Sequence, residues 1–298
     1  MNTLISIVGA TAIGKTSLSF AIAEHLECEI ISCDSRQFYK EMEIGTAVPT
    51  AEELATVPHH FIQNRSIHDS YSVGQFEQDA LALLEQLFTK NKFVVMVGGS
   101  GLYVDAVLNG LDYFPEVDPQ IRSNLNKLLE KDGLETLQAQ LEYLDPESFA
   151  KIDIQNPHRV IRALEICLGT DHTFSYYKNK PKTPRNFKSI KIGLDAPREI
   201  IYQRIEQRVD SMIQNGLLDE VKKLKPFKEL NALQTVGYRE LFSYFDDKFT
   251  LAEAISEIKK NTRRFAKRQN TWFRKDQEIK WFNYQTDSKD IIKEITKI

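Results

Sequence analysis

Residues 3–18 read TLISIVGATAIGKTSL, and this stretch decides the fold. It begins with an almost unbroken apolar run, which is typical of a parallel strand buried on both faces. Gly9, Gly14, Lys15 and Thr16 then match the spacing G-x-x-x-x-G-K-[ST], and an amphipathic pattern follows. Strand, loop and helix together predict a phosphate-binding loop whose backbone N–H groups lie at a helix N-terminus.

The same alternation continues outward from this loop. Apolar segments that predict further strands are EIISCDS (29–35), KFVVMVGG (92–99), SIKIGLD (189–195) and IKWFN (279–283), and residues 74–88 have the pattern of an amphipathic helix. Alternating strands and helices predict a parallel sheet. The expected fold class is therefore α/β, with a P-loop NTPase-like (nucleotide-kinase-like) core.

A break in this alternation predicts a second domain. The turn-rich segment FPEVDPQ begins at residue 114, and only helical patterns follow until the Pro- and Lys-rich exit KNKPKTPRNFK. We therefore predict an all-helical insertion domain over 114–187. The P-loop core would comprise residues 1–113 and 188–298, the latter with basic C-terminal helices.

Composition limits the classes of protein that fit. The chain has 298 residues and a formal net charge of −3, so any basic surface must be local. Its three cysteines lack the spacing of a zinc site, and a sparse, odd count suits a reducing compartment. We find no signal peptide and no apolar run near the roughly 20 residues that a membrane helix needs. These features predict a cytoplasmic protein.

Two further features lie where the carboxyl ends of the predicted strands should meet. The strand that ends at residue 97 runs into Gly98, Gly99, Ser100 and Gly101 rather than into the aspartate usual in ATPases. Asp34 follows another strand at the same predicted edge, where ligands bind in open α/β sheets. From position alone, Asp34 is a magnesium ligand, a general base or the N-cap of a following helix, and the glycine segment is a backbone donor site or a plain turn.

A basic segment lies near the C-terminus. Residues 255–275 contain eight Lys or Arg and one acidic residue, a local charge of +7 in a chain that is acidic elsewhere. Lys259, Arg263 and Lys267 fall on one helical stripe, which favours contacts with nucleic-acid phosphates over the alternative of a solvated charged face. The adjacent His59 and His60 are poorly spaced for a shared metal, so we interpret them as structural or loop residues.

Ordered sequence blocks now identify a family. In chain order they are GATAIGKT, SCDSRQFYKEMEIGTAVPT, VPHHFI, YSVGQFEQDA, VVMVGGSGLYVDAVL, NPHRVIRALEI, RIEQRVDSMIQNGLLDEV, TVGYRE and KNTRRFAKRQNTWFR. Over nearly its whole length the chain resembles the bacterial tRNA dimethylallyltransferases, also called tRNA isopentenyltransferases. It departs from the usual family pattern at Ala10, Ile13, Ser100 and the pair Arg36–Gln37, changes that keep the loop backbone, Lys15 and Thr16.

The resemblance implies an activity. The family transfers a dimethylallyl group from dimethylallyl diphosphate to N6 of the adenosine immediately 3′ of the tRNA anticodon, and diphosphate leaves. The implied partners are the tRNA anticodon stem-loop and the prenyl donor, with Mg²⁺ as cofactor and no membrane. We expect the protein to act as a monomer.

The resemblance also implies roles for particular residues. The diphosphate would lie on Gly9, Ala10, Thr11, Ala12, Ile13, Gly14, Lys15 and Thr16, with Mg²⁺ at the Thr16 hydroxyl. The catalytic set would be Asp34 as the base, Ser100, Arg208 and Lys15, with Arg204 one helical turn from Arg208. The implied tRNA contacts are Asp34, Ser35, Arg36, Gln37, Ser100, Arg122, His158, Arg159, Val160, Ile161, Arg162, Gln234, Thr235, Val236, Gly237, Tyr238 and Arg239, beside the basic stripe.

Three rival functions remain at this stage. An adenylate isopentenyltransferase acting on free AMP would share the fold and the donor, but would need neither the helical insertion nor the basic segment. A P-loop small-molecule kinase would turn over ATP. A nucleotide-dependent switch protein would need a base-recognition motif, which the sequence lacks.

Overall fold

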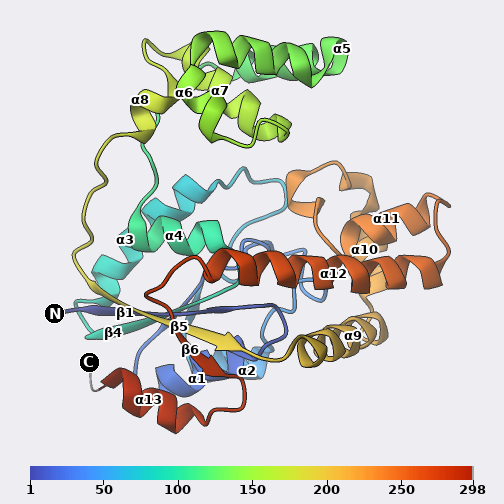
Figure 1. Ribbon diagram of the computed structural model, residues 1–298. Helices are drawn as coiled ribbons and strands as arrows, with labels where there is room; N and C mark the ends of the chain where they lie inside the picture. The colour runs from blue at the N-terminus through green and yellow to red at the C-terminus, as the bar shows by residue number, and fades with distance from the viewer. Residues whose placement is uncertain (297–298) are drawn as a thin grey trace. The chain divides into compact units, whose positions relative to one another are not determined.

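The core of the protein is a six-stranded sheet in the order β3-β2-β4-β1-β5-β6 (Figure 1). The computed structural model describes residues 1–296. The strands are β1 (Thr3–Gly9), β2 (Ile30–Ser32), β3 (His59–His60), β4 (Phe93–Val97), β5 (Lys188–Asp195) and β6 (Lys280–Asn283). Every paired strand is parallel to its neighbour. The predicted α/β class is confirmed.

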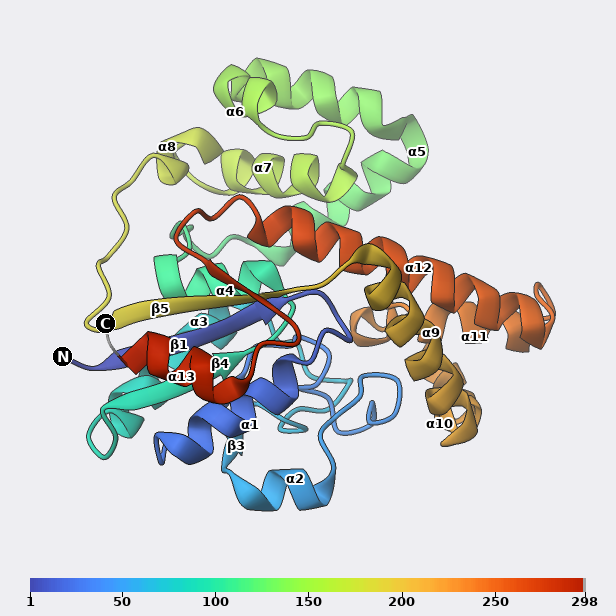
Figure 2. The same ribbon diagram turned by 60° about the horizontal axis from the view of Figure 1, so that its bottom comes forward.

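Side chains of β1 alternate between two buried layers because successive residues of a strand point to opposite faces. Ile5 and Ile7 pack with α1 (Lys15–His25) and α13 (Ser288–Thr296). Leu4 and Val8 pack with α3 (Val73–Leu87) and α4 (Gly101–Asn109). Figure 2 shows α1 and α13 on one side of the sheet and α3 and α4 on the other. With both faces covered, β1 is an apolar run rather than an alternating strand.

A third hydrophobic cluster extends the core beyond the sheet. It joins α9 (Arg198–Gln214), α10 (Leu217–Leu224), α11 (Tyr238–Phe245) and α12 (Leu251–Phe273) around the fully buried Tyr238. The remaining elements of this part are the short helix α2 (Ala51–Thr56) and the 3₁₀ turns η1 (Lys225–Phe227) and η2 (Asn231–Leu233). This cluster holds α9 and α12 beside the carboxyl ends of the strands.

The chain divides into two compact units. One comprises residues 1–108 and 185–298, and the other comprises residues 109–184. The second unit contains α5 (Pro119–Leu144), α6 (Pro146–Lys151), α7 (Pro157–Gly169) and α8 (Phe174–Lys178) around its own apolar cluster. Its bounds differ from the predicted 114–187, partly because Arg185 is tied to the first unit by donating to the carbonyls of Ala106 and Val107.

The structure decides between two pairs of local alternatives. His59 and His60 have the structural role rather than the loop role, because they form the edge strand β3, paired with Ile30 and Ile31. A pair of residues is too short to produce a periodic signal. No α-helix follows Asp34, where residues 35–38 form turns. Among the described residues, no helix is both long and apolar enough to cross a membrane.

Candidate active site

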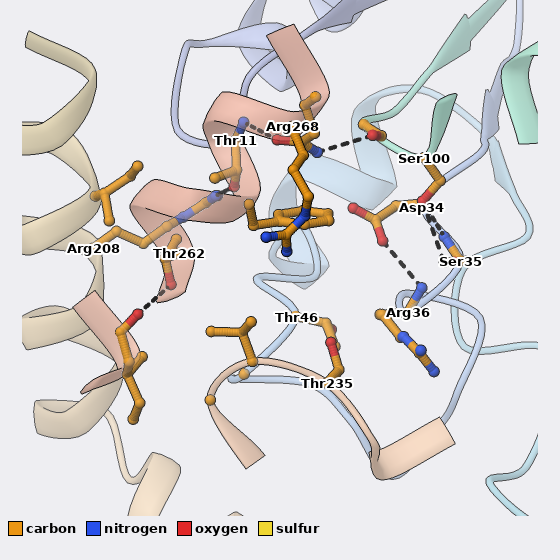
Figure 3. A pocket seen from close by; sticks show the side chains of 18 of the residues that line it. Thr11, Asp34, Ser35, Arg36, Thr46, Ser100, Arg208, Thr235, Thr262 and Arg268 are labelled. Carbon is orange, nitrogen blue, oxygen red and sulfur yellow. Dashed lines mark hydrogen bonds between the residues drawn. The ribbon is translucent and has the colours of Figure 1, made fainter. Parts of the chain in front are cut away.

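A cavity of about 550 Å³ lies at the carboxyl ends of β1, β2 and β4. Its lining includes Thr11 of the phosphate loop, Asp34 after β2 and the segment 99–103 after β4. Side chains of α9 and α12 and the segment 234–237 complete the wall. The phosphate loop, Asp34 and the glycine turn therefore meet at the sheet edge that the sequence pattern predicted. Figure 3 shows Asp34, Ser35 and Ser100 on one side of the pocket, across from Thr11 and Arg208.

The phosphate loop has the backbone of an anion cradle. Gly14 adopts φ 108°, a left-handed conformation that suits glycine, and Ala12 adopts φ 63°. Within the described part of the chain, the N–H groups of residues 12–16 have no hydrogen-bond acceptor. They precede and begin α1, so they lie at the positive end of its dipole. Free N–H groups at a helix N-terminus can bind an anionic group.

Lys15 folds back over this loop. Its Nζ donates to the carbonyls of Gly9 at 3.0 Å and Ala10 at 2.7 Å. Burial lowers the pKa of Lys15 to about 8; the charge of Asp34 opposes this shift, whereas nearby Arg208 adds to it. Burial thus disfavours the charged form of Lys15, and the nearby protein groups compensate for this only in part. An anion in the cradle would favour its charged form.

Two arginines of α9 bind the phosphate loop rather than glutamates of their own helix. Arg208 donates from Nη1 to the Thr11 hydroxyl at 3.1 Å. Arg204 donates from Nη1 to the Ile13 carbonyl at 3.1 Å. Burial lowers the pKa of Arg208, and the charge of Asp34 works against that shift. Arg208 faces the pocket, whereas Arg204 supports the loop.

Asp34 combines a cap with a free oxygen. Its Oδ1 accepts the backbone N–H of Arg36 at 3.0 Å, which fixes the turn after β2. No donor contacts its Oδ2 among the described residues. The helix-cap alternative is not realised, because Oδ1 caps a turn instead, and this turn cap leaves Oδ2 available. Ser100 lies beside this turn, where its Oγ accepts the N–H of Ser35 at 3.2 Å.

The other two residues of the DSRQ segment bind the protein itself. Arg36 donates from Nη1 to the carbonyls of Asn231 and Ala232 at 3.0 and 2.9 Å. Gln37 donates from Nε2 to the carbonyls of Thr46 and Ala47. Arg36 still lines the pocket, but its guanidinium joins the Asp34 turn to η2. Its side chain shapes the pocket in this structure.

The predicted segment Gln234–Arg239 forms the wall opposite the phosphate loop. All of it lines the pocket except Tyr238, which is fully buried and donates from its hydroxyl to Glu220 at 2.6 Å. Glu220 also accepts the N–H groups of residues 43–45. Tyr238 therefore anchors this wall, and its side chain has no exposed surface to offer an RNA.

In residues 109–184, some of the residues predicted to contact RNA are exposed and others are buried. Arg122 and Arg162 both donate to Glu165, which is almost fully buried. Burial alone would raise the pKa of that carboxyl, but the two arginines outweigh it and lower the pKa. His158 and Arg159 are exposed on α7, whereas Val160 and Ile161 lie in the apolar core of this unit. The last two predictions need correction at the side-chain level, because a helix in the family block turns these residues inward.

The basic stripe of α12 is only partly free. Lys259 pairs with Asp210 at 2.6 Å and Arg263 pairs with Glu206 at 2.7 Å, both on α9. Lys267 is exposed and forms no ion pair with any described residue. The predicted ridge is thus divided: its first part fastens α12 to α9, and its later part faces solvent. Sequence spacing could not show this, since the acidic partners come from another helix.

Several pocket residues escaped the sequence analysis. They are Gly45, Thr46, Leu102, Tyr103, Met212, Leu217, Thr262, Phe265, Arg268, Gln269 and Trp272. Arg268 and Gln269 lay in the quoted block KNTRRFAKRQNTWFR, but the block gave no direction for each side chain. Apolar members of the wall, among them Ile205, Val209, Met212, Leu217 and Val236, give the cavity a hydrocarbon surface next to its charged groups.

Comparison with known proteins agrees over nearly the full chain. The family model described as IPP transferase matches residues 37–276. A tRNA dimethylallyltransferase of Christiangramia forsetii is 63% identical over 290 residues, which cover 97% of this chain and 96% of the relative. One of Flavobacterium johnsoniae is 59% identical over 298 residues, covering 98% of this chain and 96% of the relative.

Solved structures give the same result. The full-length tRNA isopentenylpyrophosphate transferase of Bacillus halodurans has a TM-score of 0.74 at 38% identity, over 100% of this chain and 95% of that one. A eukaryotic dimethylallyltransferase acting on tRNA has a TM-score of 0.80 at 26% identity, over 95% of this chain and 74% of that one. The fold is a phosphate-loop α/β core, and these relatives identify its class as a transferase. The chain belongs to the IPP transferase family.

Proposed function

We propose that the protein transfers the dimethylallyl group of dimethylallyl diphosphate to N6 of the adenosine immediately 3′ of a tRNA anticodon. The observation that carries this proposal is the pocket itself. The cavity is lined by Thr11 of the phosphate loop, by Arg208 and Asp34, and by apolar side chains, and the free N–H groups of residues 12–16 directly follow Thr11. A donor with an anionic end and a hydrocarbon end fits that distribution. An enzyme of this kind would work in the cytoplasm.

The diphosphate end would lie on the N–H groups of residues 12–16 with Lys15 above it. When the allylic C–O bond breaks, its electron pair passes to the diphosphate, so negative charge grows there. Preorganised donors aimed at growing charge are a large source of catalysis. Arg208 would replace its hydrogen bond to Thr11 with one to a diphosphate oxygen. Ser100 would donate a hydrogen bond to the bridging oxygen, which leaves with the diphosphate.

The residues fit Mg²⁺ as a partner of the diphosphate rather than as an ion in a protein cage. The described residues hold no cluster of three His, Cys, Asp or Glu side chains able to bind a metal. Mg²⁺ usually keeps several waters and takes few protein ligands beside substrate phosphates. The Thr16 hydroxyl would supply such a ligand. The ion would neutralise charge on the leaving diphosphate.

The acceptor would lie on the Asp34 side. The N6 amine of adenine is a weak nucleophile, because its lone pair is delocalised into the ring. Its nitrogen forms the new C–N bond, and its proton would pass to the free Oδ2 of Asp34. A positioned base of this kind contributes about 10²–10⁴-fold to a rate. Oδ1 stays bonded to the Arg36 N–H and holds the carboxylate in place.

The prenyl chain would lie on the apolar wall formed by Ile205, Val209, Met212, Leu217 and Val236. The target base must leave its stack to enter the pocket, and bases in a single-stranded loop do so at lower cost than paired bases. Exposed Arg239 and Arg268, both in the pocket lining, are suited to the phosphates that flank it. These contacts explain why the acceptor would be an RNA loop rather than a small nucleotide.

A transfer assay tests the proposal. The protein is given radiolabelled dimethylallyl diphosphate with unmodified tRNA, with a tRNA whose target adenosine is replaced by guanosine, or with AMP. We expect label only in the unmodified tRNA, together with one diphosphate released per transfer. Label in AMP alone would show the free-nucleotide activity instead. Rapid ATP hydrolysis without any transfer would show a kinase-like enzyme.

A further inference from the structure

Gln269 of α12 joins two loops of the site and does not take part in the chemistry above. Its side chain is almost fully buried, with 5% exposed. Its Oε1 accepts the backbone N–H of Thr11 at 2.8 Å. Its Nε2 donates to the carbonyl of Gly99 at 2.9 Å. One amide thus bridges the phosphate loop after β1 and the glycine turn after β4.

The glycine turn is shaped around α12. A Cβ on Gly99 would lie 2.2 Å from Nε2 of Gln269, and a Cβ on Gly101 would lie 2.4 Å from Cδ1 of Trp272. Neither glycine has a positive φ, so their backbone conformations alone do not require glycine. The Trp272 indole also donates to Asp105 at 2.9 Å. These glycines allow the helix to lie directly against the turn.

We propose that Gln269 is a positioning residue for the prenyl donor, because its amide fixes the phosphate loop relative to the turn that carries Ser100. The inference rests on the proposed function. The N–H groups of residues 12–16 would hold the diphosphate from the loop side, and Ser100 would meet its bridging oxygen from the other side. Both must be placed within a fraction of an ångström for the leaving group to be stabilised.

Only an amide of this length meets both loops. Thr11 offers a donor and Gly99 offers an acceptor, so the bridging group must accept at one end and donate at the other. A carboxylate lacks the donor, and an apolar side chain leaves a buried N–H and a buried carbonyl without partners. Unpaired groups of this kind are costly where water is excluded. The loops would relax toward other partners and lose their spacing.

The test compares Gln269→Met with Gln138→Met. Methionine keeps the volume but removes both hydrogen bonds. Gln138 donates to the Ile154 carbonyl in the helical unit, so its variant loses a comparable bond away from the pocket. We expect Gln269→Met to raise KM for dimethylallyl diphosphate and Kd for inorganic diphosphate about tenfold or more, with KM for tRNA within about twofold. The control should match the wild type on all three.

Gly99→Ala provides a second test that leaves α12 unchanged. The new methyl group would displace the Gln269 amide, so donor KM should rise as in Gln269→Met. In a Gln269→Ala background the methyl group has room, and Gly99→Ala should add less than about twofold, since residues in contact are not additive. Circular dichroism melting confirms that each variant is folded.

The outcomes separate this inference from the function. If the wild type transfers the prenyl group while Gln269→Met keeps its donor KM and diphosphate Kd, the positioning role is wrong and the proposed function stands. If the Gly99→Ala effect is as large without Gln269 as with it, the bridge is also wrong. A wild type that neither binds diphosphate nor transfers the prenyl group would contradict the proposed function itself.

Discussion

Asp34 shows at the residue scale how one side chain can serve two purposes. Oδ1 caps the turn at Arg36, and Oδ2, which no described donor contacts, is the oxygen that we propose accepts the proton. An asparagine at this position would keep an oxygen for the cap but could not accept the proton from N6. For Asp34→Asn we therefore expect kcat to fall by about 10²–10⁴-fold. Donor KM and the melting temperature should stay near those of the wild type.

Single-turnover rates measured with saturating donor and tRNA check this prediction. Asp34→Ala removes the cap as well and should also lower the melting temperature, which makes it the matched comparison. A rate for Asp34→Asn within about threefold of the wild type, below the range expected of a general base, would remove Asp34 from that role.

We expect Lys15 to make donor binding sensitive to pH. Its pKa in the ligand-free protein is about 8, so its ammonium is charged below that pH and neutral above it. An anion in the loop favours the charged form. The affinity for dimethylallyl diphosphate should therefore fall as pH rises through 8, and binding at pH 8.5 should take up a proton. In Lys15→Met this loss of affinity above pH 8 should disappear.

Calorimetry in two buffers of different ionisation enthalpy measures this proton uptake.

The pKa of Lys15 also affects stability, and here the effect of rising pH is opposite to its effect on donor affinity. The folded pKa lies below the usual 10.5, so the unfolded chain holds more protons between about pH 8 and 10.5. The contribution of Lys15 to the free energy of unfolding must then rise with pH in that window. Equal heats of donor binding in both buffers at pH 8.5 would contradict the lowered pKa of Lys15.

Sequence reasoning reached some of these residues and missed others for a physical reason. Thr11 and Asp34 follow the ends of β1 and β2, so chain position predicts their place in the pocket lining, and the loop motif identifies Lys15 and Thr16 beside them. Gln269 is placed by the packing of α12 against two loops more than 160 residues away in sequence. Arg36 is bound to η2 in the same nonlocal way. No local spacing predicts such contacts.

At the scale of elements, α12 carries two kinds of basic residue. Lys259 and Arg263 are paired with acids of α9, whereas Arg264, Lys267 and Arg268 are exposed. Replacing the three exposed residues with glutamine should weaken tRNA binding. It should also reduce the slope of log Kd against log salt by the amount that corresponds to a loss of about two to three phosphate contacts. Replacing Lys259 and Arg263 should change that slope much less and destabilise the α9–α12 pairing.

Filter binding at four salt concentrations distinguishes the two variants. Equal slopes for the triple variant and the wild type would show that this face of α12 is ordinary solvated surface.

The contacts of α12 also show what helical periodicity can predict. It identified the charged stripe correctly, but the side of α12 that meets α9 depends on tertiary packing. The short strand β3 was missed for the same reason, since it is defined by pairing with β2.

At the scale of the whole molecule, each compact unit has its own core. Residues 109–184 are held partly by Glu165, whose carboxylate is 7% exposed and accepts from Arg122 and Arg162. Glu165→Ala should destabilise this unit by about 1–3 kcal/mol, because charged hydrogen bonds are lost from a nearly buried site. Diphosphate binding by the core should be unchanged.

The same carboxylate predicts an acid response. Its folded pKa is below the usual 4.5, so its stabilising contribution is present above that pH and is lost as pH falls through the folded value. Melting curves from pH 7 to pH 3 should show the wild type and Glu165→Ala converging at the acid end. A constant difference across this range would show that the pairing has no part in acid sensitivity. Sequence patterns predicted an all-helical segment here, but its C-terminal bound lies at residue 184 rather than 187, because Arg185 belongs by contact to the core.

The central claim is that the phosphate loop holds the diphosphate of a prenyl donor whose hydrocarbon end faces Asp34. The most direct measurement is a crystal structure with Mg²⁺ and dimethylallyl thiodiphosphate, whose bridging sulfur resists cleavage. We expect the diphosphate on the N–H groups of residues 12–16, the bridging sulfur near Ser100 and the C5 chain against Val209 and Met212. A thiodiphosphate bound outside this loop, or a hydrocarbon chain directed away from Asp34, would contradict the claim.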